Sequence, residues 1–178
     1  MGKKILILSS SPRKDGNSEQ LCMEFMRGVK ETGNEVELIS LRGKKMNFCL
    51  GCEVCQRNGG ICIHKDDVSG ILDKILACDV LVLATPVYYY GFAAQMKTLI
   101  DRTFAKVGMI QNKDAYLLMT GASPRQGDMN VLVASYRSFI GCFDHVTDKG
   151  IVYGTGAMEK GEIGKESLTA AYEMGRLT

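Results

Sequence analysis

Two kinds of hydrophobic pattern alternate along the chain. Short runs of consecutive apolar residues, many of them β-branched, are followed by longer segments in which apolar residues recur at every third or fourth position. The first pattern is typical of parallel strands that are covered on both faces, and the second of amphipathic helices. We predict strands at residues 5–8, 35–41, 79–84, 115–119 and 151–153.

Helical periodicity follows each of these strands. We predict helices through residues 21–29, 68–76, 99–104, 132–139 and 165–176. Because crossover connections between parallel strands are right-handed, such helices must cover both faces of one sheet. No low-complexity linker divides the chain, so we expect one α/β domain over residues 1–178, doubly wound around a five-stranded parallel sheet. A cysteine-rich loop at 46–66 follows the second strand.

Length and composition narrow the class of protein. With 178 residues, 46% of them hydrophobic and 24% charged, the chain has the composition of a soluble globular protein. The net charge of +2 and the pI of about 8.1 are too balanced for a domain that binds nucleic acid electrostatically. The longest apolar runs are far shorter than the roughly 20 residues that span a bilayer, and residues 1–4 lead into a strand instead of a signal peptide. We expect a cytoplasmic protein with neither a nucleic-acid nor a membrane partner.

Ligands of doubly wound sheets bind beyond the carboxyl ends of the strands, so the loops at those ends are the first places to look for a site. After the first strand, residues 9–18 read SSSPRKDGNS and lead directly into a helix. Helix amides and the positive dipole end favour an anion, hydroxyl and amide side chains add hydrogen bonds, and Arg13 offers a forked, charged donor. The loop therefore predicts a phosphate site, although it is neither a Walker A loop nor GxGxxG. The alternative is ordinary helix capping, in which Asn17 and Gln20 form a capping box.

Two further loops follow strands at the same edge. After the third strand, Pro86 is expected to end the strand, and consecutive tyrosines at 88–90 offer flat, amphipathic surfaces suited to a flavin ring. The alternative is that these tyrosines serve packing or an oligomer surface. After the fourth strand, Gly121 permits close approach of the backbone to a ligand.

Three motifs stand out together: residues 10–18 (SSPRKDGNS), 85–88 (TPVY) and 96–102 (MKTLIDR). With them the chain resembles, nearly from end to end, the flavodoxin-like NAD(P)H-dependent FMN reductase family, including its iron–sulfur flavoprotein branch. The resemblance implies a sheet order of 2-1-3-4-5 and bound FMN, with NAD(P)H as a transient co-substrate. It assigns the FMN phosphate to Ser11, Arg13, Asn17 and Ser18, and the edge of the isoalloxazine ring to Pro86, Val87, Tyr88 and Tyr89, with Gly121 in the third loop.

Three residues within these motifs are not assigned to the site. Ser10 stands where the family often has glycine, which affects the geometry of the turn and not the phosphate role. Asp101 and Arg102 also match a family motif. We interpret them as a charge pair on one helix face and leave them out of the site.

Four of the seven cysteines form the pattern C-x2-C-x2-C-x6-C: Cys49, Cys52, Cys55 and Cys62. An odd total and this crowding do not suit a secreted disulfide scaffold. Four thiolates can bind a [4Fe–4S] cluster or a zinc ion, and the triple spacing favours iron because zinc usually draws on two separated pairs. Metal-free thiols are a third alternative. The other cysteines are expected to be small buried hydrophobic side chains: Cys22, Cys78 and Cys142.

The leading interpretation is an FMN-dependent oxidoreductase that passes electrons from NAD(P)H to a small acceptor such as a quinone or free flavin. No side chain is assigned a catalytic role, because the flavin itself carries the chemistry. The alternative is an iron–sulfur flavoprotein electron carrier that receives electrons from ferredoxin through a cluster held by the four cysteines. A third is a metal-binding or regulatory protein without flavin. The tyrosine turn and the cysteine loop are expected to project from the same rim, and members of the family commonly associate, so we also expect a homodimer or homotetramer.

Overall fold

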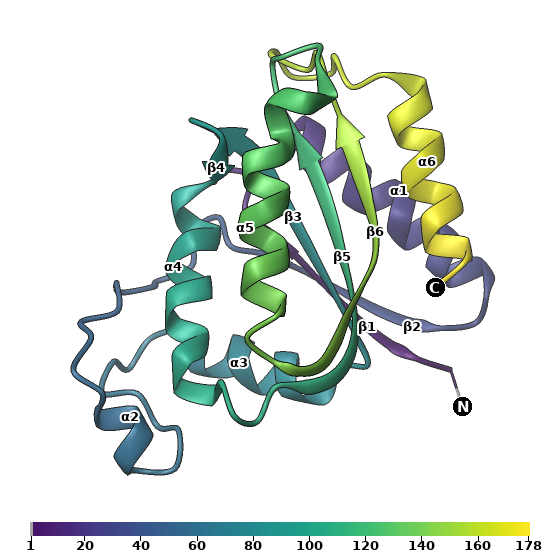
Figure 1. Ribbon diagram of the computed structural model, residues 1–178. Helices are drawn as coiled ribbons and strands as arrows, with labels where there is room; N and C mark the ends of the chain where they lie inside the picture. Colours follow the sequence, from purple (N-terminus) through teal and green to yellow (C-terminus); the bar gives the residue numbers. More distant parts are fainter. Residues whose placement is uncertain (1) are drawn as a thin grey trace.

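A parallel β-sheet lies between two layers of helices in the computed structural model, which describes residues 2–178 (Figure 1). The sheet consists of β1 (Lys4–Ser9), β2 (Glu35–Ser40), β3 (Val80–Tyr88), β5 (Gln111–Thr120) and β6 (Asp144–Gly154). These strands pair in parallel in the order β2-β1-β3-β5-β6. The predicted sheet and its order are confirmed, with one addition: β4 (Gly91–Phe92) forms an antiparallel pair with the end of β3.

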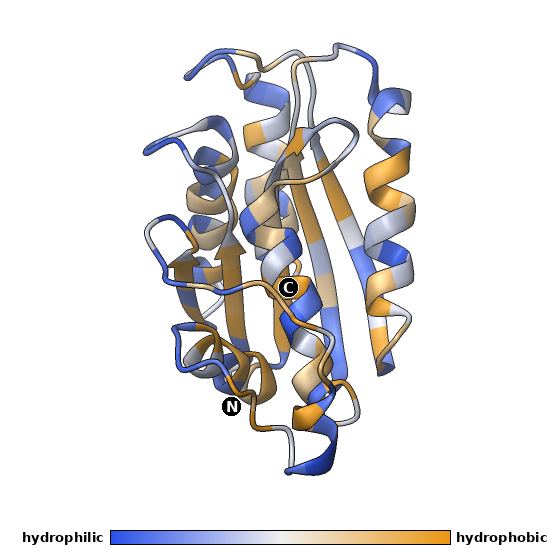
Figure 2. Ribbon diagram, turned by 90° about the vertical axis from the view of Figure 1, so that its left-hand side faces the viewer, coloured by the Kyte–Doolittle hydropathy of each residue, from blue (hydrophilic) through white to orange (hydrophobic). Residues whose placement is uncertain are grey.

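Alternate residues of the strands face opposite layers of helices. Leu6 and Leu8 of β1 belong to the core under α3 (Val68–Ala77), α4 (Ala94–Arg102) and α5 (Asn130–Ile140). Ile5 and Ile7 belong to a second core, under α1 (Asn17–Glu31) and α6 (Lys165–Arg176). Both faces of the central strands are buried, which is why their sequences are continuous apolar runs, and Figure 2 shows long orange stretches along the sheet.

The helices α1 and α6 pack backbone against backbone, as their neighbouring positions in Figure 1 indicate. Gly28 of α1 and Gly175 of α6 lie at the crossing, and a Cβ atom at either position would overlap backbone atoms of the other helix. Through this contact the C-terminal helix, which has the predicted bounds, is held against the helix that follows the first loop. Among residues 2–178, no helix has the length and apolar composition needed to cross a bilayer.

The prediction that Pro86 ends the third strand is wrong. Pro86 pairs with Thr120 of β5, and β3 continues beyond it. The amide of Ser10 donates a hydrogen bond to the carbonyl oxygen of Ala84, so Pro86, two residues further on, also directs its backbone toward the β1 side. β1 ends at Ser9, level with Ala84. The missing N–H of the proline therefore faces no neighbouring strand, and the strand tolerates it.

Of the elements that begin earlier than predicted, β6 and α4 differ most. β6 begins at Asp144, because its first half is a polar edge strand that is defined by pairing with β5 and not by apolar content. α4 begins at Ala94 and is followed by a short 3-10 helix, η1 (Thr103–Lys106). The remaining short helices lie in loops: α2 (Val54–Arg57) and η2 (Gln126–Met129).

Candidate functional site

A pocket opens at the carboxyl ends of β1, β3 and β5, where the sequence predicts a cofactor. Its lining is contributed by Ser11, Arg13, Gly16, Asn17, Ser18, Pro86, Tyr88, Thr120, Ala122, Ala157 and Met158. The structure thus brings together all four residues predicted for the phosphate and two of those predicted for the ring. Val87, Tyr89 and Gly121 are not part of this lining. Gly121 instead leaves room for Met129 and Val87, because a Cβ there would lie 2.8 Å from the Met129 methyl.

The phosphate end of the pocket is the N-terminus of α1. The cap residue is Gly16, in extended conformation, and no side chain caps the helix, so the alternative of a capping box formed by Asn17 and Gln20 is wrong. The first intrahelical bond runs from the Gln20 amide to the Gly16 oxygen. Uncapped amides at a helix N-terminus are donors that an anion can satisfy. A Cβ at Gly16 would lie 2.9 Å from Ser11 Oγ and 3.2 Å from the Arg13 oxygen, so the turn packs closely there.

Buried hydroxyl groups surround this end of the sheet. Ser18 Oγ and Thr120 Oγ1 are 2.6 Å apart, which links α1 to the end of β5. Ser10 is fully buried and donates its hydroxyl to the Ala84 oxygen at 3.1 Å. The serine that replaces the family's glycine is thus accommodated by a hydrogen bond to β3.

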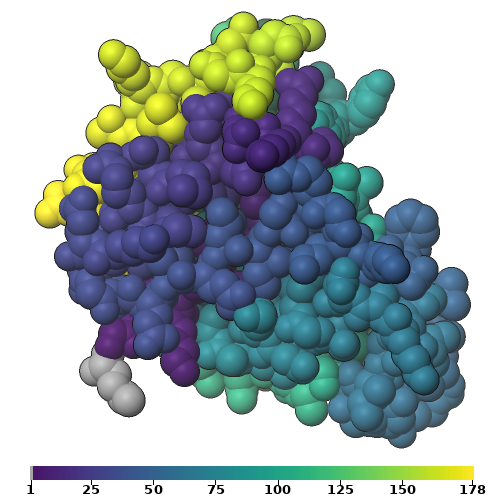
Figure 3. All heavy atoms as spheres, turned by 180° about the vertical axis from the view of Figure 1, so that it is seen from behind, coloured from purple at the N-terminus to yellow at the C-terminus, as the bar shows by residue number. Residues whose placement is uncertain are grey.

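A fourth wall of the pocket comes from the loop after β6, residues 155–164, which the sequence pattern did not indicate. Arg13 Nη1 donates to the Met158 oxygen at 2.9 Å, and Asn17 Nδ2 donates to the Glu159 oxygen at 2.7 Å. The Gly161 amide donates to Asn17 Oδ1 at 2.9 Å. Figure 3 shows this C-terminal segment, yellow, against the purple N-terminal loop. The place of this loop in the chain could have indicated its role, because it too follows a parallel strand at the carboxyl edge of the sheet.

The ring end of the pocket is formed by a strained hairpin between β3 and β4. Its two turn residues, Tyr89 and Tyr90, have φ values of 47° and 65°, in the left-handed region that a two-residue turn requires but that bulky residues rarely adopt. Tyr89 is fully exposed at the tip, whereas Tyr88 lines the pocket. The hairpin is anchored by the Ala93 amide, which donates to Thr85 Oγ1 at 3.1 Å. Backbone strain of this kind is typical of functional loops.

The four cysteines of the predicted metal site line one small pocket together with His64 and Phe104: Cys49, Cys52, Cys55 and Cys62. All four are free thiols. Positive φ values at Gly51, Gly59 and Gly60 allow the chain to turn back on itself between them. Across residues 2–178, no three histidine, cysteine or acidic side chains lie close enough together to hold a metal ion. The donor set therefore has the chemistry of a four-thiolate site, while the sulfur atoms surround a hollow without converging on one point.

The cysteine-rich loop projects beside the C-terminal end of α4, as Figure 1 shows. Gln56 Nε2 donates to the Phe104 oxygen at 2.6 Å, and Arg102 Nη1 donates to the Asn47 oxygen at 2.7 Å. The tyrosine turn precedes the opposite end of the same helix. The prediction that both features project from one rim is therefore wrong, because nine residues of helix separate them, roughly 13 Å at 1.5 Å per residue.

The interpretation of Asp101 and Arg102 as one charge pair is also wrong. Asp101 pairs on the surface with Lys97, one helical turn earlier, at 2.6 Å. Arg102 is buried and forms its ion pair with Asp66 at 2.8 Å. Consecutive helix positions point in different directions, and the docked cysteine-rich loop supplies Asp66 as the partner. The Arg102 guanidinium and two backbone amides hold the pKa of Asp66 well below its usual range, despite its burial.

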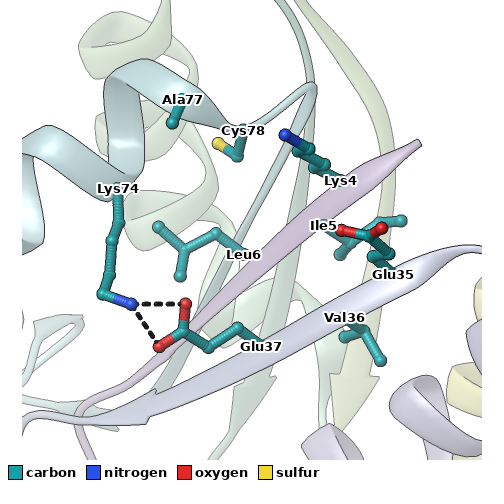
Figure 4. A pocket seen from close by; sticks show the side chains of 9 residues that line it. All are labelled: Lys4, Ile5, Leu6, Glu35, Val36, Glu37, Lys74, Ala77 and Cys78. Atoms are coloured by element: carbon teal, nitrogen blue, oxygen red, sulfur yellow. Dashed lines mark hydrogen bonds and ion pairs between the residues drawn. The ribbon is translucent and has the colours of Figure 1, made fainter.

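Two other places with cysteines carry no part of the predicted chemistry. A hollow at the amino ends of β1 and β2, shown in Figure 4, is crossed by an ion pair from Lys74 Nζ to Glu37 Oε1 at 2.6 Å. Burial raises the pKa of Cys78, at its edge, to about 11, so this thiol is unreactive. Cys142 is exposed, against the prediction that it is buried.

Residues 3–138 match the family described as NADPH-dependent FMN reductase. An iron-sulfur flavoprotein of Methanocaldococcus jannaschii is 37% identical over 138 residues, which cover 76% of this chain and 70% of that protein. An iron-sulfur flavoprotein of Archaeoglobus fulgidus is 30% identical over 174 residues, which cover 97% of this chain and 77% of that protein. Among solved structures, an NAD(P)H:quinone oxidoreductase from Methanothermobacter marburgensis superposes with a TM-score of 0.79 at 19% identity, over 99% of this chain and 96% of the other. That similarity concerns the fold.

Proposed function

The chain belongs to the NADPH-dependent FMN reductase family and is an NAD(P)H-dependent flavin oxidoreductase, and from this premise we propose that it passes electrons from NAD(P)H to a small acceptor such as a quinone or free flavin. The observation that carries the proposal is the uncapped N-terminus of α1 at the floor of a pocket rich in buried hydroxyls. When bound, FMN supplies the redox chemistry, accepting hydride from NAD(P)H and returning the electrons to the acceptor.

The residues of the pocket bind and orient the cofactor. Ser11, Ser18 and the first amides of α1 receive the phosphate, and Arg13 adds a charged donor. Only one of the five N–H donors of Arg13 is used by the Met158 oxygen, so the others are free to face the phosphate. Tyr88 borders the ring, and Val87, Tyr89 and Gly121 are proposed as its more distant neighbours. Because one pocket serves both substrates, oxidised dinucleotide must leave before the acceptor enters.

The test is to titrate the protein with FMN, following quenching of flavin fluorescence, and then to measure oxidation of NADH and NADPH. Replacement of Arg13 by Gln removes one charged hydrogen bond and is expected to weaken FMN binding by roughly ten- to a hundredfold. Arg27→Gln is the matched control, because Arg27 lies on α1, does not line the pocket, and contacts Glu24, Glu31 and the ring of Tyr172. A wild-type protein that takes up no FMN would overturn the proposal.

A second proposal concerns the four cysteines. They hold a [4Fe–4S] cluster, and the protein then also acts as an electron carrier that receives electrons from ferredoxin through Cys49, Cys52, Cys55 and Cys62. Two observations support it: the four free thiols line one pocket, and the relatives reported above are described as iron-sulfur flavoproteins. Seven free cysteines also suit the reducing cytoplasm, which is the proposed location.

Iron and sulfide assays on protein purified without oxygen test this second proposal. About four of each per chain is the expected result, and the iron is expected to be lost in Cys55→Ser but retained in Cys142→Ser. Zinc in place of iron, or four thiols that react freely with a thiol reagent, would contradict the cluster and leave the flavin chemistry intact. Transfer of electrons from reduced ferredoxin, followed by bleaching of the cluster absorbance, tests the partner.

A third proposal is that the protein is a homodimer or homotetramer. Large apolar side chains are exposed around the cysteine-rich loop: Phe48, Leu50, Ile61, Ile63 and Phe104. Exposed apolar side chains gathered on and beside one loop favour association, and a second copy of the chain is the occupant we propose. Light scattering is expected to give a mass of two or four chains. The double variant Phe48→Ser/Leu50→Ser is expected to reduce it to one, and a monomeric wild-type protein would contradict the proposal.

A further inference from the structure

Arg102 is a buried cation at the end of α4, where the cysteine-rich loop docks. Its side chain and that of Asp66 are each 2% exposed, and they form a forked ion pair at 2.8 and 3.1 Å through Nη1 and Nη2. Nη1 also donates to the Asn47 oxygen. The Asp66 carboxylate accepts three further hydrogen bonds, from the backbone amides of Asn47 and Val68 and from Asn47 Nδ2. The carboxylate side of the pair is therefore fully engaged.

One donor of this arginine is left over. The Nε atom of Arg102 is buried and has no hydrogen-bond partner among residues 2–178. Buried donors of charged groups are rarely left without an acceptor, because the cost of removing them from water is then not recovered. An orphaned N–H in an otherwise complete ion pair therefore points to an acceptor that gains its full strength only in another chemical state.

Cys62 is the group that meets this description. Cys62 and Arg102 line one pocket, and Cys62 also lines the pocket shared by the four cysteines. Burial disfavours the charged guanidinium, yet Asp66 and then the Cys62 sulfur, as charge and hydrogen-bond partners, hold the pKa of Arg102 above its ordinary value. Cys62 and Arg102 thus face the same hollow, while the Nη atoms of Arg102 are engaged by Asp66.

Thiols and thiolates differ as acceptors. A protonated thiol accepts a hydrogen bond weakly, whereas a sulfur that is bound to metal carries negative charge and accepts a charge-assisted bond. Hydrogen bonds to the sulfur ligands of an iron–sulfur cluster stabilise its more negative, reduced state and so raise its reduction potential.

We propose that Arg102 is a positioning residue for the metal site: its Nε–H donates to the Cys62 sulfur when that sulfur is a cluster ligand, and this bond raises the reduction potential of the cluster. The inference rests on the proposal that the four cysteines bind iron. It gives Arg102 a role that pairing along the helix face does not explain, because its neighbour Asp101 forms its ion pair with Lys97.

The test is a spectroelectrochemical titration of the iron-loaded protein and three variants. Arg102→Gln removes the donor and is expected to shift the midpoint potential negatively, by roughly a tenfold loss in the equilibrium constant for reduction, or about 59 mV for one electron. Asp66→Asn keeps the donor and removes its compensating charge, so the potential is expected to shift positively. Lys106→Gln is the charge control, because Lys106 lines the same pocket as Cys62 and Arg102. It is expected to shift the potential less than Arg102→Gln does, because its partly exposed charge is screened by water.

The opposite directions of the two expected potential shifts distinguish this role from a structural one. Both Arg102→Gln and Asp66→Asn break the buried ion pair and lower thermal stability, so a merely structural role would move the two potentials in the same direction. Shifts of equal sign, or no shift in either variant, would overturn the proposal while leaving the cluster and the flavin chemistry in place. If Arg102→Gln does not retain iron, Asp66→Asn alone tests the proposal. A positive shift of its midpoint potential supports the proposal, and a negative shift or none overturns it. A wild-type protein without iron overturns this inference together with the cluster, whereas FMN binding stays a separate measurement.

Discussion

The side chain of Asn17 donates a hydrogen bond of 2.7 Å to the carbonyl oxygen of Glu159, 142 residues further along the chain. The bond connects the first helical residue after the phosphate loop to the last loop at the carboxyl edge of the sheet. The cofactor pocket is thus closed by residues from both ends of the chain. Its affinity for FMN and the order of the C-terminal loop are expected to depend on each other.

We predict that Asn17→Ala weakens FMN binding by roughly tenfold and destabilises the protein by about 2–3 kcal/mol, because three hydrogen bonds to the loop at 155–164 are lost. FMN titration and urea unfolding measure the two effects. Asn34→Ala is the control, since Asn34 accepts a bond from the Lys3 amide at the opposite edge of the sheet. It is expected to lower stability with unchanged FMN affinity. Equal FMN affinities in both variants would contradict the assignment of the loop to the pocket.

The strained tyrosine hairpin leads to a prediction of increased stability. Tyr90→Gly is expected to stabilise the free protein by about 1 kcal/mol, because glycine adopts the left-handed conformation at little steric cost. Tyr88→Gly is the matched control: Tyr88 lies in a strand, and its replacement is expected to destabilise the protein. Thermal unfolding distinguishes them. Stabilisation combined with slower oxidation of NAD(P)H would indicate that the strain serves function, and destabilisation by Tyr90→Gly would contradict the strain itself.

The buried pair of Asp66 and Arg102 predicts a pH dependence of stability. The pKa of Asp66 is depressed in the folded protein from an ordinary value of 3.8, so the stabilisation is fully present above that value and is lost as the pH falls toward the folded pKa. Urea unfolding of metal-free protein at pH 7 and at pH 3 measures the loss. Asp66→Asn is expected to cost roughly 3–5 kcal/mol at pH 7 and to lose less than the wild type on acidification. A variant with the full acid dependence of the wild type would refute the assignment to Asp66.

The single flavin pocket predicts the form of the kinetics. Because the dinucleotide and the acceptor use the same exposed side of the cofactor, the reaction is expected to proceed by a ping-pong mechanism. Initial rates measured with NADH or NADPH at several fixed quinone concentrations should give parallel double-reciprocal lines. Intersecting lines would mean that both substrates bind together, and a second binding place would then have to be sought.

The positions of the strands and of the phosphate loop could be predicted from the sequence because both depend on local chemistry. Apolar runs mark strands that are buried on both faces, and the polar segment at 9–18 is followed directly by a helix, so its place at the carboxyl edge follows from the fold class. Local patterning fails where pairing with a neighbour determines the element. Pro86 remains within a strand because β1 has already ended beside it, and the polar half of β6 is a strand because β5 lies next to it.

The sequence by itself determined the fold class, the order of its elements and the residue types that can bind a phosphate and a metal. Only the tertiary structure decided which of these residues meet. Asn17 meets Glu159, Arg102 meets Asp66 instead of its neighbour Asp101, and the cysteine-rich loop docks at the far end of α4 from the flavin pocket. The physical reason is that hydrogen bonds and ion pairs act over a few ångströms between segments that are distant in sequence. Periodicity places a residue on an element, and the packing of the elements selects its partner.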